Sequence, residues 1–466
     1  MDDFLREIQT SLFREWINNQ KRDYYHLHQS ETDPDAIIIE NEYCYSYVTF
    51  NPQCIIELCV MNKRTDEMAF YLHFQFKTLK HAISLFEEMD QCIKKMIDQP
   101  ICRLLLCCSG GMTTAFFADK IKNGIKVLNM ELAATSYQKI YNVAQNYDVI
   151  LLAPQVSYVK LQVEKVFKNK LVLKIPTQIF ASYNVGALIT FIEESLKHKE
   201  NKYNGYVEPL ASMMEIKTNK NVLAVSINAN GENSHISYRL YNSHQDIVLD
   251  SNIIKSNIKL QDVLDALDTV VLQNEMIDVI SIALPGVMVE GNVYSGIIEG
   301  GNHQLKERLE KRYEKEIYLI NDVNAAVVGY YASQNEYKSL AFLFQPIGRM
   351  AGSGIVVNGQ LVRGMDHLAG EVALLPLNLS DAYLTLANTP EGTLELVTKN
   401  IMSIIAIVAP EAIVVYSDLI LDSQDVSDEI KKALSQYPLK VYPQIIKVEN
   451  ILEYILLGAM ILSAKE

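Results

Sequence analysis

Apolar side chains recur at every second position through much of the first hundred residues. In residues 70–76, phenylalanine and leucine alternate with Tyr71, His73 and Gln75, which is typical of a strand that buries one face. The whole pattern predicts helices over 4–19 and 79–96 and strands over 36–40, 43–50, 54–61 and 67–76. We therefore expect a small α+β domain over residues 1–98, in which we recognise no catalytic motif.

Residues 99–198 replace this alternation with short apolar runs separated by helical patterns. The pattern predicts strands over 101–107, 125–130, 149–152 and 171–175, and helices over 114–122, 137–146, 158–166 and 185–198. Such an order indicates a doubly wound parallel sheet with helices on both faces. We expect Cys107 to point into this sheet as the last strand residue. The polar stretch that follows contains Asn204 and Gly205 and predicts a linker over 199–219.

Residues 220–466 form the largest block and again mix strands with helices. Strands are expected over 221–228, 279–283, 316–320, 340–344, 354–357 and 412–415. The block contains no short internal repeat. The predicted fold class is therefore α/β, with a small N-terminal α+β unit in front of two larger parts.

Composition narrows the possible functions. A length of 466 residues suggests two to three domains, and 49% apolar with 21% charged residues is ordinary for a protein with buried cores. The net charge of −14 argues against nucleic acid as a partner. The apolar run over 401–416 is too short to span a bilayer and is broken by Pro410 and Glu411.

The thiols favour a reducing compartment. All seven cysteines lie at or before Cys108, and none forms a metal-type Cys-x-x-Cys pair, so no metal site is expected. We expect reduced, buried thiols at Cys44, Cys54, Cys59, Cys92 and Cys102. The acidic start lacks the features of a secretory segment, which favours a cytoplasmic protein. Surface or core histidines without a ligand are expected at His26, His28, His73 and His81.

The strongest candidate for a reactive site follows the apolar run 104–106. That run ends in Cys107 and Cys108, and the next residues are Ser109, Gly110, Gly111, Met112, Thr113 and Thr114. A cysteine between a strand and a helix faces backbone N–H groups at the positive end of the helix, which stabilise a thiolate or a phosphate on its sulfur. We expect Cys108 to carry a phosphoryl group that residues 109–114 bind. A buried thiol on a silent scaffold is the alternative. A phosphatase would need an arginine where Thr113 or Thr114 stands.

This loop resembles the Cys-Ser-Ala-Gly-Met-Ser-Thr loop of the lactose/cellobiose-type IIB domains of the phosphotransferase system (PTS). The matching residues are Cys108, Ser109, Gly111, Met112 and Thr114. Residues 148–158 are similar to the family's strand that ends in Gly-Pro-Gln-Ile-x-Tyr, so the likeness covers about 99–198. It implies that Cys108 accepts a phosphoryl group from a phosphohistidine on a IIA protein and passes it toward a sugar held by a membrane IIC component. No cofactor is needed for that transfer.

The block 220–466 resembles the ROK family (repressors, uncharacterised open reading frames and sugar kinases). The similar segments are 283–287, 321–326, 354–364, 369–371, 409–415 and 457–459. The resemblance implies the two-lobed actin-like ATPase fold, with sugar and nucleotide between the lobes. It also implies that Asp322 is the base for a sugar hydroxyl, and that Asn321 and Glu371 hydrogen-bond the sugar.

The phosphate-binding loops depart from the ROK pattern. Residues 226–230, 348–352 and 416–418 replace three glycine-rich loops. Because backbone N–H groups approach phosphate closely only where side chains leave room, Ala229 and Met350 obstruct that approach, and Asp418 would repel phosphate. Leu374 replaces a histidine that contacts sugar and often zinc in the family. We expect this domain to have lost sugar kinase activity, so that ATP and Mg²⁺ matter only if it is active.

Three functions remain open. The first is a PTS phosphocarrier whose ROK-like domain senses sugar or docks partners. The second is a non-enzymatic, PTS-linked regulator, and the third is a divergent ATP-dependent sugar kinase. The expected partners are a phosphorylated IIA protein, a membrane IIC component and a sugar. Direct DNA binding is disfavoured because residues 1–98 look strand-rich. The sugar, the role of residues 1–98 and the formation of a homo-oligomer stay open.

Overall fold

In the computed structural model, the chain divides into two compact units. One unit comprises Met1–Gln99, Glu215–Asp322 and Ala459–Glu466, and the other comprises Pro100–Met214 and Val323–Gly458. Each is treated by itself. The structure describes residues 3–63, 67–98, 102–109, 117–122, 130–167, 170–197, 219–230, 233–289, 292–294, 297–299, 304–365, 368–420, 422–435, 437 and 442–465.

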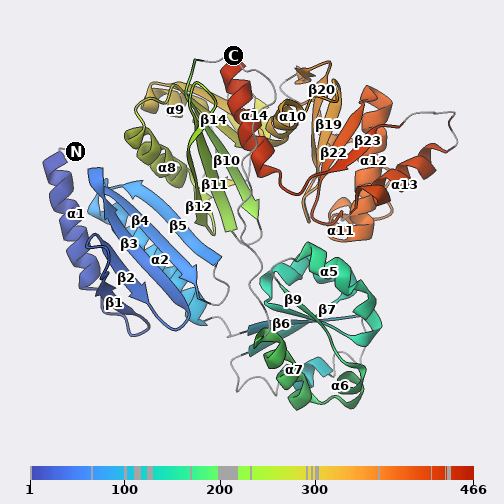
Figure 1. Cartoon of the computed structure of the whole chain (residues 1–466), viewed down its shortest axis with the longest axis horizontal. Helices are drawn as coiled ribbons and strands as arrows, with labels where there is room; N and C mark the ends of the chain where they lie inside the picture. The colour runs from blue at the N-terminus through green and yellow to red at the C-terminus, as the bar shows by residue number, and fades with distance from the viewer. Residues whose placement is uncertain are drawn as a thin grey trace. The chain divides into compact units, whose positions relative to one another are not determined.

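The N-terminal part of the first unit is an antiparallel sheet packed against two helices (Figure 1). Its elements are α1 (Asp3–Asn18), β1 (His26–Gln29), β2 (Ala36–Glu40), β3 (Cys44–Asn51), β4 (Ile55–Asn62), β5 (Glu67–Gln75) and α2 (Leu79–Asp98). Phe13 of α1 packs edge-on against Phe86 of α2, with ring centroids 6.4 Å apart. The apolar pattern predicted β2, β3, β4 and β5, some of which, such as β2, are buried along their whole length. It missed β1, whose side chains are mostly exposed.

The rest of the first unit forms the first lobe of the C-terminal block. Its main elements are β10 (Val222–Asn230), β11 (Asn233–Tyr241), β12 (Ile247–Lys255), α8 (Leu260–Gln273), β14 (Val279–Leu284), α9 (Leu305–Tyr313) and β18 (Glu316–Asn321). Short strand pairs are β13 (Ile258–Lys259) with β17 (Ile298–Glu299), and β15 (Val287–Val289) with β16 (Asn292–Tyr294). The strands β10, β14 and β18 run parallel, so their carboxyl ends share one edge.

One continuous sheet joins the two parts of this unit. Its ten strands follow the order β1-β2-β3-β4-β5-β12-β11-β10-β14-β18. The junction is the antiparallel pairing of β5 with β12, where Tyr71 lies opposite Ile254. Side chains from both parts belong to one hydrophobic cluster, which includes Phe74 and Ile253. Residues 1–98 therefore extend the sheet of the first lobe.

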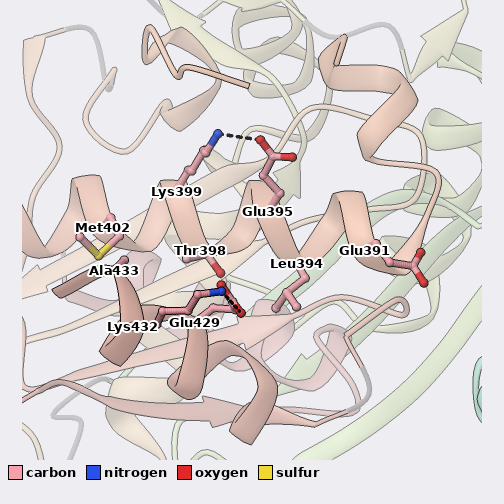
Figure 2. Close-up of a pocket in the computed structure, with 9 residues that line it drawn as sticks. All are labelled: Glu391, Leu394, Glu395, Thr398, Lys399, Met402, Glu429, Lys432 and Ala433. Atoms are coloured by element: carbon pink, nitrogen blue, oxygen red, sulfur yellow. Dashed lines mark hydrogen bonds and ion pairs between the residues drawn. The ribbon is translucent and has the colours of Figure 1, made fainter. Parts of the chain in front are cut away.

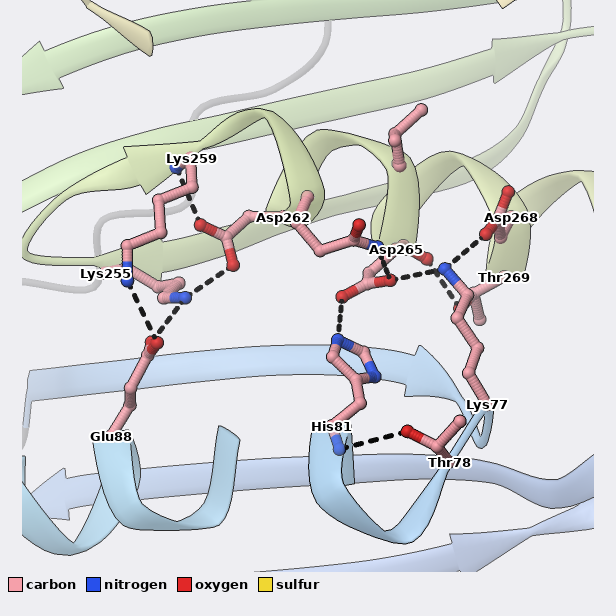
Figure 3. A network of polar contacts seen from close by, with 12 residues as sticks. Lys77, Thr78, His81, Glu88, Lys255, Lys259, Asp262, Asp265, Asp268 and Thr269 are labelled. Carbon is pink, nitrogen blue, oxygen red and sulfur yellow. Dashed lines mark hydrogen bonds and ion pairs between the residues drawn. The ribbon is translucent and has the colours of Figure 1, made fainter. Parts of the chain in front are cut away.

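Ion pairs reinforce this junction (Figure 3). Lys77 Nζ lies 2.6 Å from Asp265 Oδ1 and 2.5 Å from Asp268 Oδ2 on α8, and His81 Nε2 lies 2.9 Å from Asp265 Oδ2. Lys255 contacts Glu88 of α2 at 2.6 Å. Burial alone would raise the pKa of Asp265, but the hydrogen bonds from His81 and Lys77 outweigh it and lower the pKa. These pairs tie α2 and the segment before it to α8.

In the second unit, residues 102–197 form a separate parallel sheet, here called the middle domain. Its elements are β6 (Cys102–Cys108), β7 (Met130–Ser136), α4 (Ile140–Val143), β8 (Val149–Leu152), α5 (Lys160–Val166), β9 (Leu171–Lys174), α6 (Thr177–Ser182) and α7 (Val185–Lys197). The strand order is β7-β6-β8-β9, all parallel. In Figure 1, α5 covers one face and α6 and α7 the other, which confirms the doubly wound arrangement.

Two strand ends of the middle domain differ from the expectation. Residues 125–129 of the strand expected over 125–130 lie outside the described residues, and β7 extends to Ser136, past the expected end at 130. Its sequence MELAATS contains small residues instead of a run of large aliphatic ones, so the pattern hid it. The strand β6 also runs one residue past Cys107, because Cys108 still pairs with Ser136 of β7.

The second lobe of the C-terminal block completes this unit. Its elements are α10 (Asp322–Ala332), β19 (Leu340–Phe344), β20 (Gly352–Val357), β21 (Gln360–Leu361), α11 (Tyr383–Leu386), α12 (Pro390–Val408), β22 (Ala412–Tyr416), α13 (Ser423–Leu434), β23 (Gln444–Lys447) and α14 (Leu452–Lys465). Asp322 of α10 and the residues of α14 from Ala459 onward belong to the first unit. The sheet order is β21-β20-β19-β22-β23, and β19, β22 and β23 are parallel. The fold is mixed α/β, as expected. No helix in the described ranges combines the length and apolar character of a membrane span.

The helices α10 and α14 cross at two glycines. A Cβ atom on Gly458 would lie 1.8 Å from the carbonyl oxygen of Ala325, and one on Gly329 would lie 2.0 Å from that of Tyr454. Only hydrogen at these two positions lets the backbones approach so closely. The match of residues 457–459 to a ROK segment thus includes a glycine with a packing role.

Candidate functional site

Cys108 stands at the carboxyl end of β6, the central position of the middle sheet. The chain leaves β6 toward β7 on one side and later adds β8 on the other, and ligands of such sheets bind where this direction changes. The Cys108 side chain is only 6% exposed, and its Sγ donates to the carbonyl oxygen of Thr135 at 3.5 Å. Any donor must therefore reach the sulfur from the strand-end edge.

The residues expected to bind phosphate are only partly described. Ser109 is exposed at the end of β6. Gly110, Gly111, Met112, Thr113 and Thr114 lie outside the described residues, so their expected role stays a prediction. Residues 117–122 are helical and bury Phe117 and Ile121 in the domain core.

Cys107 precedes Cys108 on β6 and is also buried. It is fully buried, as expected of a residue that points into the sheet. Burial, and to a smaller extent the neighbouring charge of Cys108, raises the pKa of Cys107 to about 12. Cys107 therefore stays a thiol at neutral pH, which makes it an internal control for the chemistry of Cys108.

The other cysteines fit the expectation in part. All seven are free, which agrees with reduced thiols. Three of the five that we expected to be buried are so: Cys44, Cys59 and Cys102. Cys54 and Cys92 are half-buried instead. Cys54 directly precedes β4, and Cys92 lies on α2, so neither position is enclosed on all sides.

In the first unit, two predicted sugar-site residues meet at a strand end. Asn321 ends β18, opposite Leu284 of β14, and its Nδ2 donates to the carbonyl oxygen of Gly286 at 3.1 Å. Gly286 has φ +126°, a backbone conformation that favours glycine. Asp322 starts α10 directly after β18 and is 8% exposed. The parallel strands thus bring Asn321, Asp322 and the Pro285-Gly286 turn to one edge.

Glu371 belongs to the second unit and is held by the glycine before it. Gly370 has φ +91°, and a Cβ there would lie 1.9 Å from the carbonyl oxygen of Ser353 in β20. The N–H of Ser353 donates to the carbonyl oxygen of Gly370 at 3.0 Å. Glu371 itself is half-buried, and burial raises the pKa of its carboxyl. Glu371 lies in the second unit, whereas Asp322 lies in the first.

The loop after β19 has two of its backbone donors already engaged. This loop, residues 346–351, contains most of the segment that matches the family's second phosphate loop. The N–H of Gly348 donates to the carbonyl oxygen of Ala387 at 2.9 Å, and the N–H of Ala351 donates to the hydroxyl of Tyr383 at 3.2 Å. Two backbone N–H groups of this loop therefore donate hydrogen bonds to other parts of the protein.

A buried side chain fills the interior of the same loop. Gln345 is fully buried, and its Nε2 donates to the carbonyl oxygens of Pro346 at 2.9 Å and Arg349 at 3.0 Å. The hydroxyl of Tyr383 donates to Gln345 Oε1 at 2.8 Å. Sequence reasoning missed both Gln345 and Tyr383. A buried polar residue directly after an apolar strand was the available signal.

The segment that replaces the family's first phosphate loop is paired strand. The ladder between β10 and β11 continues without interruption from Val222 and Tyr241 to Asn230 and Asn233. Ser226, the first residue of the segment 226–230, is buried. A regular antiparallel ladder uses the backbone groups that would otherwise cradle a phosphate.

A separate groove of about 410 Å³ lies between α12 and α13 (Figure 2). None of the predicted site residues lines it, and its lysines are paired, Lys399 with Glu395 at 2.6 Å and Lys432 with Glu429 at 3.4 Å. Within the described ranges, no cluster of three or more His, Cys, Asp or Glu side chains could hold a metal ion.

Family models match two parts of the chain. Residues 103–190 match the lactose/cellobiose-specific IIB subunit of the PTS, and residues 230–392 match the ROK family. The chain joins a PTS IIB domain to a ROK domain. Both resemblances found in the motifs are thereby confirmed, and the IIB domain contains Cys108 while the ROK domain contains Asn321, Asp322 and Glu371. None of the curated proteins searched matches this sequence.

Solved structures similar to the two domains are distant in sequence. A ROK family protein from Streptococcus pneumoniae TIGR4 in complex with sucrose is 18% identical over 52% of this chain and 97% of its own, with a TM-score of 0.43. A ROK family glucokinase from Streptomyces griseus in complex with glucose and AMPPNP is 16% identical over 52% and 98%, with a TM-score of 0.40. The lactose-specific IIB component domain from Streptococcus pneumoniae is 23% identical over 20% and 95%, with a TM-score of 0.18.

Proposed function

We propose that this protein is a PTS phosphocarrier of the cytoplasm in which Cys108 takes up and passes on a phosphoryl group. The observation that carries the proposal is the position of Cys108 at the strand-end edge of a domain that matches the PTS IIB family. Cys107 is unsuited to the role because its thiol is fully buried. The partners are a phosphorylated IIA protein and a membrane IIC component.

The proposed transfer has two balanced steps. In the first, Sγ of Cys108 attacks phosphorus and a sulfur–phosphorus bond forms. The bond to the histidine nitrogen of the IIA protein breaks, and the thiol proton passes to that nitrogen. In the second, a sugar hydroxyl oxygen attacks the same phosphorus, the sulfur–phosphorus bond breaks, and the hydroxyl proton passes to the departing thiolate. The hydrogen bond from Sγ to Thr135 must break first, since it uses the thiol proton. Residues 109–114 would then supply the donors for the phosphate.

Incubation with a phosphorylated IIA protein of the lactose/cellobiose type tests this proposal. We expect an acid-sensitive phosphothiol in the wild-type chain and in Cys107→Ser, and none in Cys108→Ser. Mass spectrometry after proteolysis identifies the labelled peptide. The absence of label on Cys108 with every such donor would refute the proposal. Label that persists in Cys108→Ser but disappears in Cys107→Ser would refute the choice of residue.

We further propose that the ROK domain senses a sugar without phosphorylating it. The engaged N–H groups of Gly348 and Ala351 and the buried Gln345 support this, because two backbone donors of the second phosphate loop already bind other parts of the protein. Asn321, Asp322 and Glu371 remain candidates for sugar hydroxyls. A panel of glucose, N-acetylglucosamine and mannose with ATP and Mg²⁺ tests the idea. ATP consumption that depends on the sugar and is lost in Asp322→Asn would instead establish a divergent kinase.

A further inference from the structure

The IIB domain and the second lobe of the ROK domain, residues 323–458, touch each other within one compact unit. The hydroxyl of Tyr137 donates to Oε1 of Glu391 at 3.0 Å. Tyr137 directly follows β7, and the residue before it, Ser136, pairs with Cys108. Neighbouring strands lie about 4.8 Å apart. The contact with Glu391 is therefore made at the same strand-end edge that presents Cys108.

Apolar side chains of the second lobe join this contact. Leu419 is 2% exposed and belongs to the hydrophobic cluster of the IIB domain, together with residues such as Leu106 and Val156. Ile347 packs against the same cluster. The second lobe thus contributes part of the wall of the IIB core.

Two of the contacting residues, Ile347 and Leu419, directly flank the segments 348–352 and 416–418 that replace glycine-rich phosphate loops. Ile347 lies in loop 346–351 after β19, and Leu419 lies three residues beyond the end of β22. Glu391 is in the first turn of α12. Because β19 and β22 are parallel neighbours, both loops lie at one edge of their sheet. This edge carries the matches to the family's phosphate-binding glycine segments, 348–352 and 416–418.

We propose that the strand-end edge of the IIB domain docks on this edge of the second lobe, in the place that a nucleotide would take, and that phosphate on Cys108 opens the contact. The docking stands on the contacts above, and only the opening rests on the proposed function. A phosphocysteine would add about −1.5 to −2 charges at the edge that faces Glu391. Asp418, next to Leu419, adds to the repulsion. The contact between the ROK domain and the IIB domain of the same chain would then depend on whether Cys108 is phosphorylated.

Hydrogen exchange of the full chain followed by mass spectrometry tests the docking. Leu419→Asp should speed exchange at least tenfold in peptides covering 137–146 and 346–351, and leave peptides from β10 and β11 unchanged. Leu374→Asp is the control, because Leu374 is an exposed leucine of the same lobe, at 76%. Unchanged exchange in 137–146 would overturn the docking.

A second pair of variants covers the case in which Leu419→Asp does not fold. Tyr137→Phe and Glu391→Ala should each speed exchange a few-fold in 137–146. The double variant should exceed neither single variant, because both substitutions remove the same hydrogen bond. Additive effects, or none, would overturn the docking.

The same measurement after phosphorylation by a phosphorylated IIA protein tests the opening. The labelled chain should exchange in 137–146 and 346–351 as Leu419→Asp does, while Cys108→Ser treated in the same way should not change. Labelled chain that exchanges like unlabelled chain overturns the opening and leaves the phosphocarrier function intact. A chain that takes no label refutes the phosphocarrier function and the opening together, and the docking is then judged from the variants alone.

Discussion

The hydroxyl of Tyr383 donates a hydrogen bond to Oε1 of Gln345 at 2.8 Å and accepts one from the N–H of Ala351. Tyr383→Phe should destabilise loop 346–351, because a buried amide oxygen and a backbone N–H lose their partner, at a cost of about 2 kcal/mol. Faster hydrogen exchange in this loop measures the effect. Tyr437→Phe is the control, because Tyr437 is 53% exposed. Equal exchange in the two variants would contradict the assigned role of Tyr383.

The crossing of α10 and α14 predicts a steric effect. Gly458→Ala should lower the free energy of unfolding of its unit by about 3 kcal/mol, because the new methyl group collides with the backbone of Ala325. Gly186→Ala should be tolerated, since the nearest atom to a Cβ there is 3.6 Å away. Calorimetric melting compares the two variants. A melting temperature of Gly458→Ala that matches the wild type would show that the helices do not cross so closely.

Burial of a histidine at the sheet junction predicts a dependence on pH. His73 is 6% exposed, its Nε2 lies 3.2 Å from the hydroxyl of Tyr238, and burial lowers its pKa to about 4. The unfolded histidine has a pKa of about 6.5, so the unfolded chain binds a proton that the folded chain does not. The free energy of unfolding should therefore fall as pH drops from about 6.5 to about 4, by up to about 3 kcal/mol.

Trp16, the only tryptophan, packs against the same core and reports this unfolding. Urea titrations at several pH values should show a smaller loss of stability in acid for His73→Gln than for the wild type. The control is His28→Gln at an exposed histidine. The prediction fails if the acid dependence of His73→Gln equals that of the wild type.

The ion pairs at the sheet junction predict a large effect of one carboxylate. Asp265 is 3% exposed and faces both Lys77 and His81. Asp265→Asn should cost about 3 kcal/mol, since it leaves a partly buried lysine without one of its carboxylate partners. Urea denaturation followed through Trp16 measures the change. Asp23→Asn, at an exposed aspartate, should be nearly neutral. A loss in Asp265→Asn as small as that in Asp23→Asn would mean that the network adds little to stability.

The elements that were predicted well are those with a strong local pattern. The strands β2, β8 and β19 have the predicted bounds, because each is an uninterrupted apolar run between polar residues. The extension of β7 to Ser136 was missed, because the small residues of this strand give a weak pattern. Of the candidate site, Cys108, Asn321 and Glu371 were found through motifs, each at or beside a strand end or a tight turn.

The amino-acid sequence by itself determined most of the strands and helices, the strand end at which Cys107 and Cys108 lie, and which two families the domains resemble. These features depend on residues close together in the chain. Only the tertiary structure decided that β5 pairs with β12, that Gln345 and Tyr383 fill a loop, and that Tyr137 meets Glu391. Each joins segments far apart in the chain, and such contacts depend on which faces meet once the elements have packed, which local patterns do not encode.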